Sequence, residues 1–483
     1  MKTALGAALL TAALALCACG TSAPSSADAR ATAADAADVD AQVWQNLEHY
    51  LAVIRAGDAP VGPRTGTDTD RAVHEWMRDQ LAATPGLQDM QVQSFAFPQF
   101  VPHRYSLSVQ TADGAFSPQV FPWFYQGRTD DNGVSGTLRV ISDSPTQDDL
   151  TGAIVYFQSR LAFNSESGAA QRTVDAAQQA GAVGAIVSFS NAPADQIPAQ
   201  NYDSAQGYRH LPTLVVSGND GARIAAAAGS MAQLVLTADE VQGHSQNVAA
   251  LLPGSDPSRM LVVATPMTGW LLSGGERGPG VGGLLYLARY YAAQAQAGHP
   301  PPVSIWFAVT GAHEVYGFGV ERFLSCLPLD QVAAYVHLGS GLVSRRYDHS
   351  GAPTDSLSQN RTLSVSENPL LQKIAAQRFL AQTDLQPLFD LPPSLFDPGE
   401  ARVAYAQGIP MLSLSGTNPY HHTAGDDESQ ILRGALAPMI LAYRNAIDDL
   451  LALDPATLRA ANAASGPVAQ DPGYGCAAPL SGV

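Results

Sequence analysis

The sequence predicts an α/β protein with a mixed, mainly parallel sheet flanked by helices. Three segments carry this prediction: an apolar run at 260–265, a helix-period segment at 280–294 and a second apolar run at 303–309. Short apolar runs that alternate with a helix are typical of a strand–helix–strand unit in a buried parallel sheet. Ligands bind at the carboxyl ends of such strands. The turn at 265–277 and His313-Glu314, which is expected to open the next helix, should therefore face one crevice.

Length, composition and charge limit the number of domains and the kinds of partner that the protein can have. A chain of 483 residues is too long for one ordinary core, so two or more domains are expected. The apolar content of 46% is ample for burial. The formal net charge of −17 argues against a nucleic-acid partner, because no basic block offsets it.

The first 19 residues are predicted to be an export signal rather than part of the fold. Lys2 precedes an apolar stretch at 4–16 that is too short to span a bilayer. The following Leu16-Cys17-Ala18-Cys19-Gly20 resembles a bacterial lipoprotein box, which implies cleavage before Cys19 and lipidation of its thiol. A plain signal peptide cut near Ala23 is the alternative. The segment 20–40, rich in Ala, Ser and Asp, is expected to be a tether.

These residues place the protein in the bacterial cell envelope, with a lipid anchor as its contact with the membrane. It would face the periplasm or the cell exterior, and Gly20 after the lipidated Cys19 resembles an outer-membrane sorting signal. No other segment of the sequence is predicted to cross a membrane.

Two cysteines remain once Cys17 and Cys19 are assigned to the signal. In an oxidising compartment, Cys326 and Cys476 could form a disulfide that fastens the C-terminal tail, 456–483, to the core. Two free buried thiols are the alternative. Cys326 is not expected to be a nucleophile, because no histidine stands beside it in the sequence.

Past the tether, apolar residues at helical spacing predict helices at 43–54 and 70–81, and alternation predicts a strand at 90–97. These elements form the first part of the main domain, 41–105. Amphipathic helices are also predicted at 370–380 and 435–451.

From 106 to 240 the chain changes to short strands and loops. The segments 152–157, 169–189 and 211–224 together resemble the protease-associated domain, a small β-rich α/β module that carries no catalytic group. The aromatic cluster Trp123-Phe124-Tyr125 is interpreted as part of its core, with a substrate platform as the alternative.

The stretch 245–266, SQNVAALLPGSDPSRMLVVATP, resembles the entry to the catalytic domain of metallopeptidase family twenty-eight. This family contains the co-catalytic zinc aminopeptidases and glutamate carboxypeptidase-like enzymes. The stretches GVGGLLYLAR, FAVTGAHE, AAYVHLGSG, AQGIPMLSLSG and PYHHTAGDD follow in the family's order. The resemblance implies a zinc aminopeptidase-like domain at 241–455, an inserted protease-associated domain before it and a peptide substrate.

The metal ligands that this resemblance implies are only partly present. The family binds two zinc ions, and the two private ligand positions of one ion hold Pro266 and Gly339 in this chain. The positions that remain hold Glu276, Glu314 and His422. Two carboxylates and one imidazole, with water as the fourth ligand, would form an open site for a single zinc. Glutaminyl cyclases, which share the fold, hold one zinc in this way.

The family's general-base position holds His313, whose imidazole could take a proton from a zinc-bound water. Arg277 would lie near the vacated ion and hold a substrate carbonyl or carboxylate. It could instead pair with Glu276 and Glu314 and leave no metal. A register shift of one residue would put Arg277 itself at the bridging position.

Each of these residues could instead have a purely structural role, without catalysis or metal binding. Glu276-Arg277 fits an ordinary loop ion pair, and His313-Glu314 fits a helix N-terminus where the dipole favours the carboxylate. His337 shares a strand face with Gly339, so it is either a substrate-binding residue of the crevice or a satisfied core histidine.

Two further positions complete the candidate site. Glu400 falls where the family often has a substrate-pocket carboxylate. One of His421 and His422 is expected in the crevice, with His422 the better match and with Thr423 and Asp426 as its supports.

Two functions fit this residue set. The first is a hydrolase or acyl-transfer enzyme that acts on peptides with at most one zinc. The second is a catalytically inactive protein that uses the same fold for binding.

Overall fold

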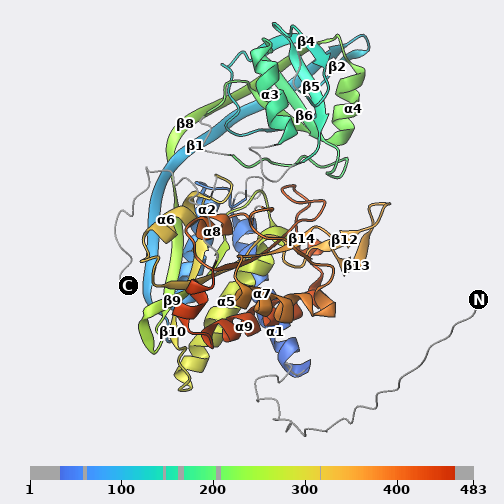
Figure 1. The fold of residues 1–483 in the computed structure, drawn as a ribbon. Coiled ribbons are helices and arrows are strands. Elements are labelled where there is room, and N and C mark those ends of the chain that lie inside the picture. Colours follow the sequence, from blue (N-terminus) through green and yellow to red (C-terminus); the bar gives the residue numbers. More distant parts are fainter. Residues whose placement is uncertain are drawn as a thin grey trace, which may run out of the picture.

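The computed structural model describes residues 33–57, 62–144, 148–161, 168–202, 208–315, 317–396 and 398–462. Two lobes are joined by a long antiparallel ribbon of β1 (Gln88–Thr111) and β8 (Met231–Leu252), seen at the left of Figure 1. The chain before β1 and after β8 forms the main lobe, and the chain between them forms the second lobe.

A mixed, mainly parallel sheet runs through the main lobe, which confirms the predicted fold class. Its central strands are mutually parallel: β9 (Asp256–Pro266), β10 (Val303–Thr310), β11 (Val332–Leu338) and β16 (Met411–Gly416). Antiparallel pairing adds β8 beside β10 and β14 (Arg361–Val365) beside β16. The strands predicted at 260–265 and 303–309 are therefore β9 and β10.

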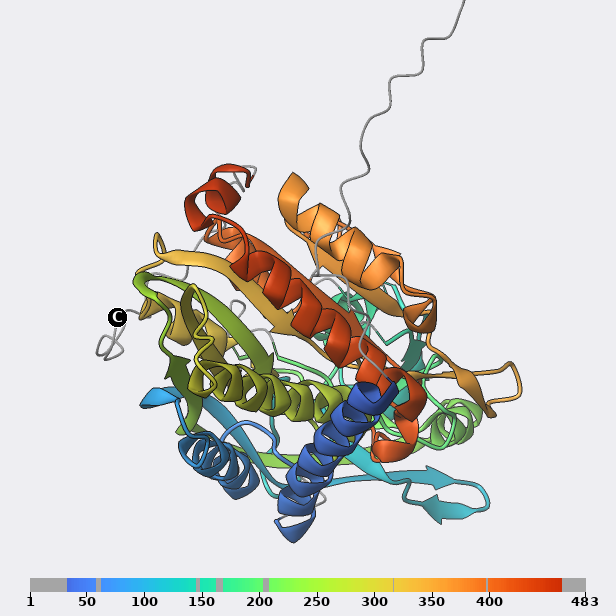
Figure 2. The same ribbon diagram turned by 90° about the horizontal axis from the view of Figure 1, so that it is seen from below.

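Helices cover both faces of this sheet. On β10, Ile305 and Phe307 join a core that also contains residues of α1 (Ala33–Ala56), α5 (Gly274–Gln296) and α9 (Leu436–Leu451). Their neighbours Trp306 and Ala308 join a separate core with α6 (Phe318–Ser325) and α8 (Ala401–Ala406). Consecutive side chains of a strand point to opposite faces, so both faces are buried. Figure 2 shows α1 (blue), α5 (olive) and α9 (red) together on one face.

Glycines allow α5 to lie close to its neighbours. A Cβ at Gly282 would come within 2.6 Å of the backbone oxygen of Val43 on α1, and a Cβ at Gly280 within 2.6 Å of Thr265 Oγ1 on β9. This close packing fixes the first turn of α5, which carries Glu276 and Arg277, at the ends of the strands.

The remaining elements of the main lobe complete the sheet and its helical cover. They are α2 (Asp68–Ala82), β12 (Arg345–Tyr347), β13 (Pro353–Leu357), α7 (Pro369–Ala375) with a π-helical turn at Ala376–Leu380, β15 (Phe389–Asp390) and α10 (Pro455–Ala460). Short 3-10 turns lie at Thr383–Leu385, Glu428–Gln430 and Arg433–Ala435. The helices predicted at 43–54, 70–81, 370–380 and 435–451 are all present.

Three predicted boundaries are wrong. Helix α1 begins at Ala33, so 33–40 are helical rather than part of a tether. Helix α6 begins at Phe318, because Gly317 adopts a left-handed conformation (φ +72°) just before it, and His313-Glu314 lie in the preceding turn. Helix α10 buries Leu458 in the core, so the start of the expected tail belongs to the main lobe.

The second lobe combines a small sheet with two helices. Its strands are β2 (Gly114–Phe116), β3 (Val120–Pro122), β4 (Val134–Val140), β5 (Ile154–Ser159), β6 (Gly184–Phe189) and β7 (Thr213–Val216), and its helices are α3 (Ala169–Gln179) and α4 (Gly218–Ala226). Trp123, Phe124 and Tyr125 are buried, as their interpretation as core requires. The identification of this lobe as a protease-associated domain stays a prediction.

Cys326 follows α6, is buried and is disulfide-bonded. Its expected partner Cys476 lies outside the described residues, as do Cys19 and the export signal, so these assignments stay predictions. None of the helices in the described ranges has the length and apolar character that crossing a bilayer requires.

Candidate functional site

Three segments that follow parallel strands bring the predicted site residues together. Glu276 and Arg277 follow β9, His313 and Glu314 follow β10, and His422 follows β16. The carboxyl ends of parallel strands meet at one edge of a sheet, which is where ligand sites form in such folds. Sequence positions that span almost 150 residues therefore lie within contact distance of one another.

Arg277 stands between two carboxylates. Its Nη2 lies 2.8 Å from Glu276 Oε1 and 3.4 Å from Glu314 Oε1, and its Nε donates to the backbone oxygen of Thr268 at 2.6 Å. The side chain is fully buried, and Nη1 has no hydrogen-bond partner. Glu314 Oε2 accepts a hydrogen bond from Thr65 Oγ1 at 2.9 Å. The guanidinium thus occupies the space between Glu276 and Glu314.

The Glu276 oxygen that pairs with Arg277 also belongs to a group of three metal-type donors. Glu276 Oε1 lies 3.4 Å from His422 Nε2 and 3.6 Å from His421 Nε2. Across the described ranges, this is the one set of three or more His, Cys, Asp or Glu donors that converges closely enough to hold a metal. The expected ligand set therefore changes by one member: His421 joins Glu276 and His422, whereas Arg277 separates Glu314 from Glu276.

These three residues fit a single zinc ion in donor type, and the two distances from Glu276 Oε1 to the histidine nitrogens fit its spacing. Zinc–nitrogen and zinc–oxygen bonds of about 2.0–2.1 Å in a tetrahedral site put neighbouring donor atoms roughly 3.3 Å apart. Neither carboxylate oxygen of Glu276 accepts a hydrogen bond of good geometry, although both are buried. A buried carboxylate without hydrogen bonds requires a cation beside it, and Arg277 meets only part of that requirement.

Glu276 and Asp426 are neighbouring carboxyl groups with opposite pKa shifts. Burial alone would raise the pKa of Glu276, but Arg277 with His421 and His422 holds it well below its ordinary value. Burial, with the charge of Glu276 adding to it, raises the pKa of Asp426 from 3.8 to about 8. At neutral pH, Glu276 is therefore ionised and Asp426 is mostly protonated.

Asp426 does not support His422 in the expected way. Its Oδ2 accepts the backbone N–H of Glu276 at 3.1 Å, and its Oδ1 accepts from Asn418 Nδ2 at 3.0 Å. The partner of His422 is instead the backbone oxygen of Ala199, which lies 3.2 Å from its Nδ1. Because a carbonyl oxygen only accepts, the Nδ1–H group donates this bond, and Nε2 faces Glu276 Oε1.

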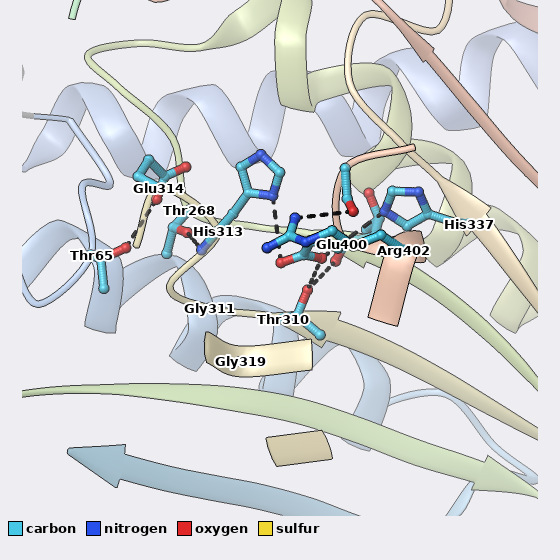
Figure 3. Close-up of polar contacts among 12 residues, drawn as sticks. Thr65, Thr268, Thr310, Gly311, His313, Glu314, Gly319, His337, Glu400 and Arg402 are labelled. Carbon is cyan, nitrogen blue, oxygen red and sulfur yellow. Dashed lines mark hydrogen bonds and ion pairs between the residues drawn. The ribbon is translucent and has the colours of Figure 1, made fainter. Parts of the chain in front are cut away.

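A second polar cluster surrounds Glu400 (Figure 3). Thr310 Oγ1 donates to Glu400 Oε2 at 2.6 Å, while Oε1 lies 3.5 Å from His313 Nδ1. His337 lies on the other side, with its Nε2 at 4.0 Å from Oε2 and its Nδ1 at 2.8 Å from Ser413 Oγ. The structure thus brings His313, His337 and Glu400 together, and their substrate-binding or catalytic roles stay predictions.

Burial sets the charge of this second cluster. It lowers the pKa of His337 to about 4 and, with the charge of Arg277 adding to it, lowers the pKa of His313 to about 3. Burial also raises the pKa of Glu400. Both imidazoles are therefore neutral near pH 7. His313 is the most accessible of the three, with 16% of its side chain exposed.

The fold of this chain is that of the zinc aminopeptidase-like α/β proteins. Among solved structures, the chain is similar to a zinc aminopeptidase from Bacillus subtilis, with a TM-score of 0.65 and 15% identity over 85% of this chain and 94% of that chain. It is also similar to a peptidase M28 precursor from Shewanella amazonensis SB2B, with a TM-score of 0.64 and 16% identity over 90% of this chain and 100% of that chain.

An aminopeptidase from Aneurinibacillus sp. strain AM-1 gives a TM-score of 0.56 at 15% identity, over 90% of this chain and 99% of that chain. No family model and no curated protein sequence matches the chain. At these identities the likeness establishes the fold that the sequence predicted.

Proposed function

We propose that this protein is a peptidase-like hydrolase of peptides that uses one zinc ion held by Glu276, His421 and His422. The observation that carries the proposal is the convergence of these three donors at the edge where parallel strands end, in a zinc aminopeptidase-like fold. One carboxylate and two imidazoles form the ligand set of an open catalytic zinc site. Bound there, zinc would polarise a carbonyl group and lower the pKa of a water molecule.

The surrounding residues orient these donors and exclude water. Asp426 holds the backbone of Glu276, and the backbone oxygen of Ala199 holds the His422 ring. Arg277 keeps Glu276 ionised, and its Nη1 is positioned to donate to a ligand oxygen because it has no other partner. The neutral His313 imidazole, whose side chain is 16% exposed, is the proposed proton acceptor.

A second candidate function, recognition of peptides without catalysis, is favoured by the Arg277 ion pairs. One guanidinium beside Glu276 and Glu314 offsets part of the negative charge that a metal would otherwise compensate. In that case the same edge of the sheet binds a ligand through hydrogen bonds alone.

Metal analysis separates the candidates. Purified protein dialysed against zinc and then freed of excess metal is expected to retain about one zinc per chain. Glu276→Gln and His421→Asn should each abolish retention, while Glu314→Gln, the matched control, should leave it. Loss in Glu314→Gln with retention in His421→Asn would restore the ligand set expected from sequence. A wild-type protein that retains no zinc would leave only the recognition role.

The protein is further proposed to be exported and anchored to the cell envelope through a lipid on Cys19. The support is the Leu16–Gly20 pattern alone, because these residues lie outside the described ranges. Cells grown with labelled palmitate should incorporate label into the wild-type protein and not into Cys19→Ala, which should leave the membrane fraction. Equal labelling of both proteins would contradict the anchor.

A further inference from the structure

The second lobe contributes a segment to the candidate site. Residues 198–202, here called the strap, cross from that lobe to two site residues of the main lobe. The N–H of Ala199 donates to the backbone oxygen of His422 at 2.9 Å, and the oxygen of Ala199 accepts from His422 Nδ1. The N–H of Tyr202 donates to the backbone oxygen of Glu314 at 2.8 Å. The strap therefore contacts loops from two different strands.

Side chains hold the strap from both lobes. Asn201 Oδ1 accepts a hydrogen bond at 2.7 Å from Nε1 of Trp270, which lies in the main lobe just before α5. The ring of Tyr202 stacks on Tyr125 of the second lobe, with a centroid separation of 3.8 Å. Ala199 itself is fully buried. These contacts fix the strap as a structured part of the interface between the lobes.

The strap lies against a strained residue. His422 has a φ of +62°, a left-handed conformation that a residue with a Cβ adopts at a cost of about 1–2 kcal/mol. Such conformations persist where the surroundings hold them in place. Ala199 bonds both the backbone and the ring of His422, so the orientation of this imidazole depends on the second lobe.

The donors next to the strap are withdrawn from solvent. Glu276 is 1% exposed and His422 is 3% exposed. Figure 1 shows the second lobe directly above the main lobe, connected to it by the β1–β8 ribbon. A ligand can therefore contact Glu276 and His422 only if the residues that bury them move.

We propose that the strap is a positioning element of the site: the Ala199 carbonyl fixes His422 with its proton on Nδ1 and its Nε2 toward Glu276, and the same segment covers these donors. Movement of the second lobe away from the main lobe would then expose Glu276 and His422 to solvent. The same movement would break the hydrogen bonds between Ala199 and His422. The covering role stands on the contacts alone, and the effect on zinc rests on the function proposed above.

Carbethoxylation of histidines in the metal-free protein tests the covering role. Asn201→Ala and Trp270→Phe remove the same hydrogen bond from its two partners. In the wild-type protein, diethyl pyrocarbonate should modify His421 and His422 at least about tenfold more slowly than His103, whose side chain is 51% exposed. Each variant should raise these two rates roughly threefold or more, and the double variant should add little, since one bond is lost in all three.

Ser217→Ala is the matched control, because it removes a hydrogen bond to the N–H of Asp220 within the second lobe. It should leave both rates unchanged. Modification of His421 and His422 at the rate of His103 in the wild-type protein, or rates unchanged in both strap variants, would overturn the proposal.

Zinc affinity tests the positioning role in the same proteins. Loss of a group that orients a ligand typically weakens metal affinity 10–100-fold, so Asn201→Ala and Trp270→Phe should raise the zinc Kd by about that factor. Wild-type zinc affinity in both variants would refute the positioning of His422. If the wild-type protein binds no zinc, the proposed function fails, and the carbethoxylation rates still decide whether the strap covers and holds these histidines.

Discussion

Replacing Arg277 by methionine is expected to lower the free energy of unfolding by about 3–5 kcal/mol. The substitution keeps much of the side-chain volume but removes the guanidinium that lies 2.8 Å from Glu276 and 3.4 Å from Glu314. Both carboxylates are buried, so each would lose the guanidinium that lies beside it. Denaturant unfolding of wild type and variant in the presence of EDTA measures the difference.

A second substitution shows whether the loss comes from uncompensated charge. Glu314→Gln in the Arg277→Met background should recover part of the stability, because the neutral amide can still accept from Thr65 Oγ1. Arg71→Met is the control, since Arg71 forms an exposed ion pair with Asp68 and its loss should cost less than about 1 kcal/mol. If Arg277→Met is as stable as the wild type, Arg277 does not hold the two carboxylates together.

The protonated Asp426 is expected to make the protein less stable as the pH rises. Its pKa is about 8 in the folded chain and 3.8 without the fold, so between these values the folded state binds a proton that the unfolded state releases. The resulting stability is fully present below pH 4 and is lost as the pH rises through 8. The free energy of unfolding should fall by roughly 1 kcal/mol per pH unit across this window from this group.

Asp426→Asn should remove this part of the pH dependence, because the amide does not titrate. Unfolding measured at about pH 5.5 and about pH 8 should therefore give a smaller difference for the variant than for the wild type. Asp427→Asn, measured in the same way, provides the comparison at the adjacent position. Equal slopes for Asp426→Asn and the wild type would show that Asp426 is ionised in the folded protein.

Hydrophobic periodicity predicted most of the fold. The apolar runs that became β9 and β10 are buried on both faces, and such runs identify central parallel strands without further information. Parallel topology then predicts that Glu276 and Glu314 lie at one edge of the sheet, and the family resemblance adds His422. The boundary of α6 was missed because the sequence does not show that Gly317 takes a left-handed conformation ahead of the helix.

The details of the site depend on contacts that the sequence does not encode locally. Thr65 reaches Glu314 across 249 positions, and Ala199 reaches His422 across 223 positions through a backbone atom that every residue type possesses. The sequence predicted one of His421 and His422 in the crevice, whereas the structure places both beside Glu276. The sequence likewise left open whether Arg277 pairs with Glu276 and Glu314, which the structure shows.

The β1–β8 ribbon makes the two lobes mechanically continuous. Its ladder runs from Gln88 opposite Leu251 to Val109 opposite Ala232, with register shifts between Gln88 and Gln91 and between Pro102 and Arg104 and no loop in either strand. Relative motion of the lobes must therefore bend this hydrogen-bonded ribbon, because no flexible linker joins β1 or β8 to the two lobes. A bent ribbon is expected to return elastically to its original shape. Excising the second lobe would cut both strands of the ribbon and leave unpaired strand edges, so the two lobes are expected to unfold as one unit.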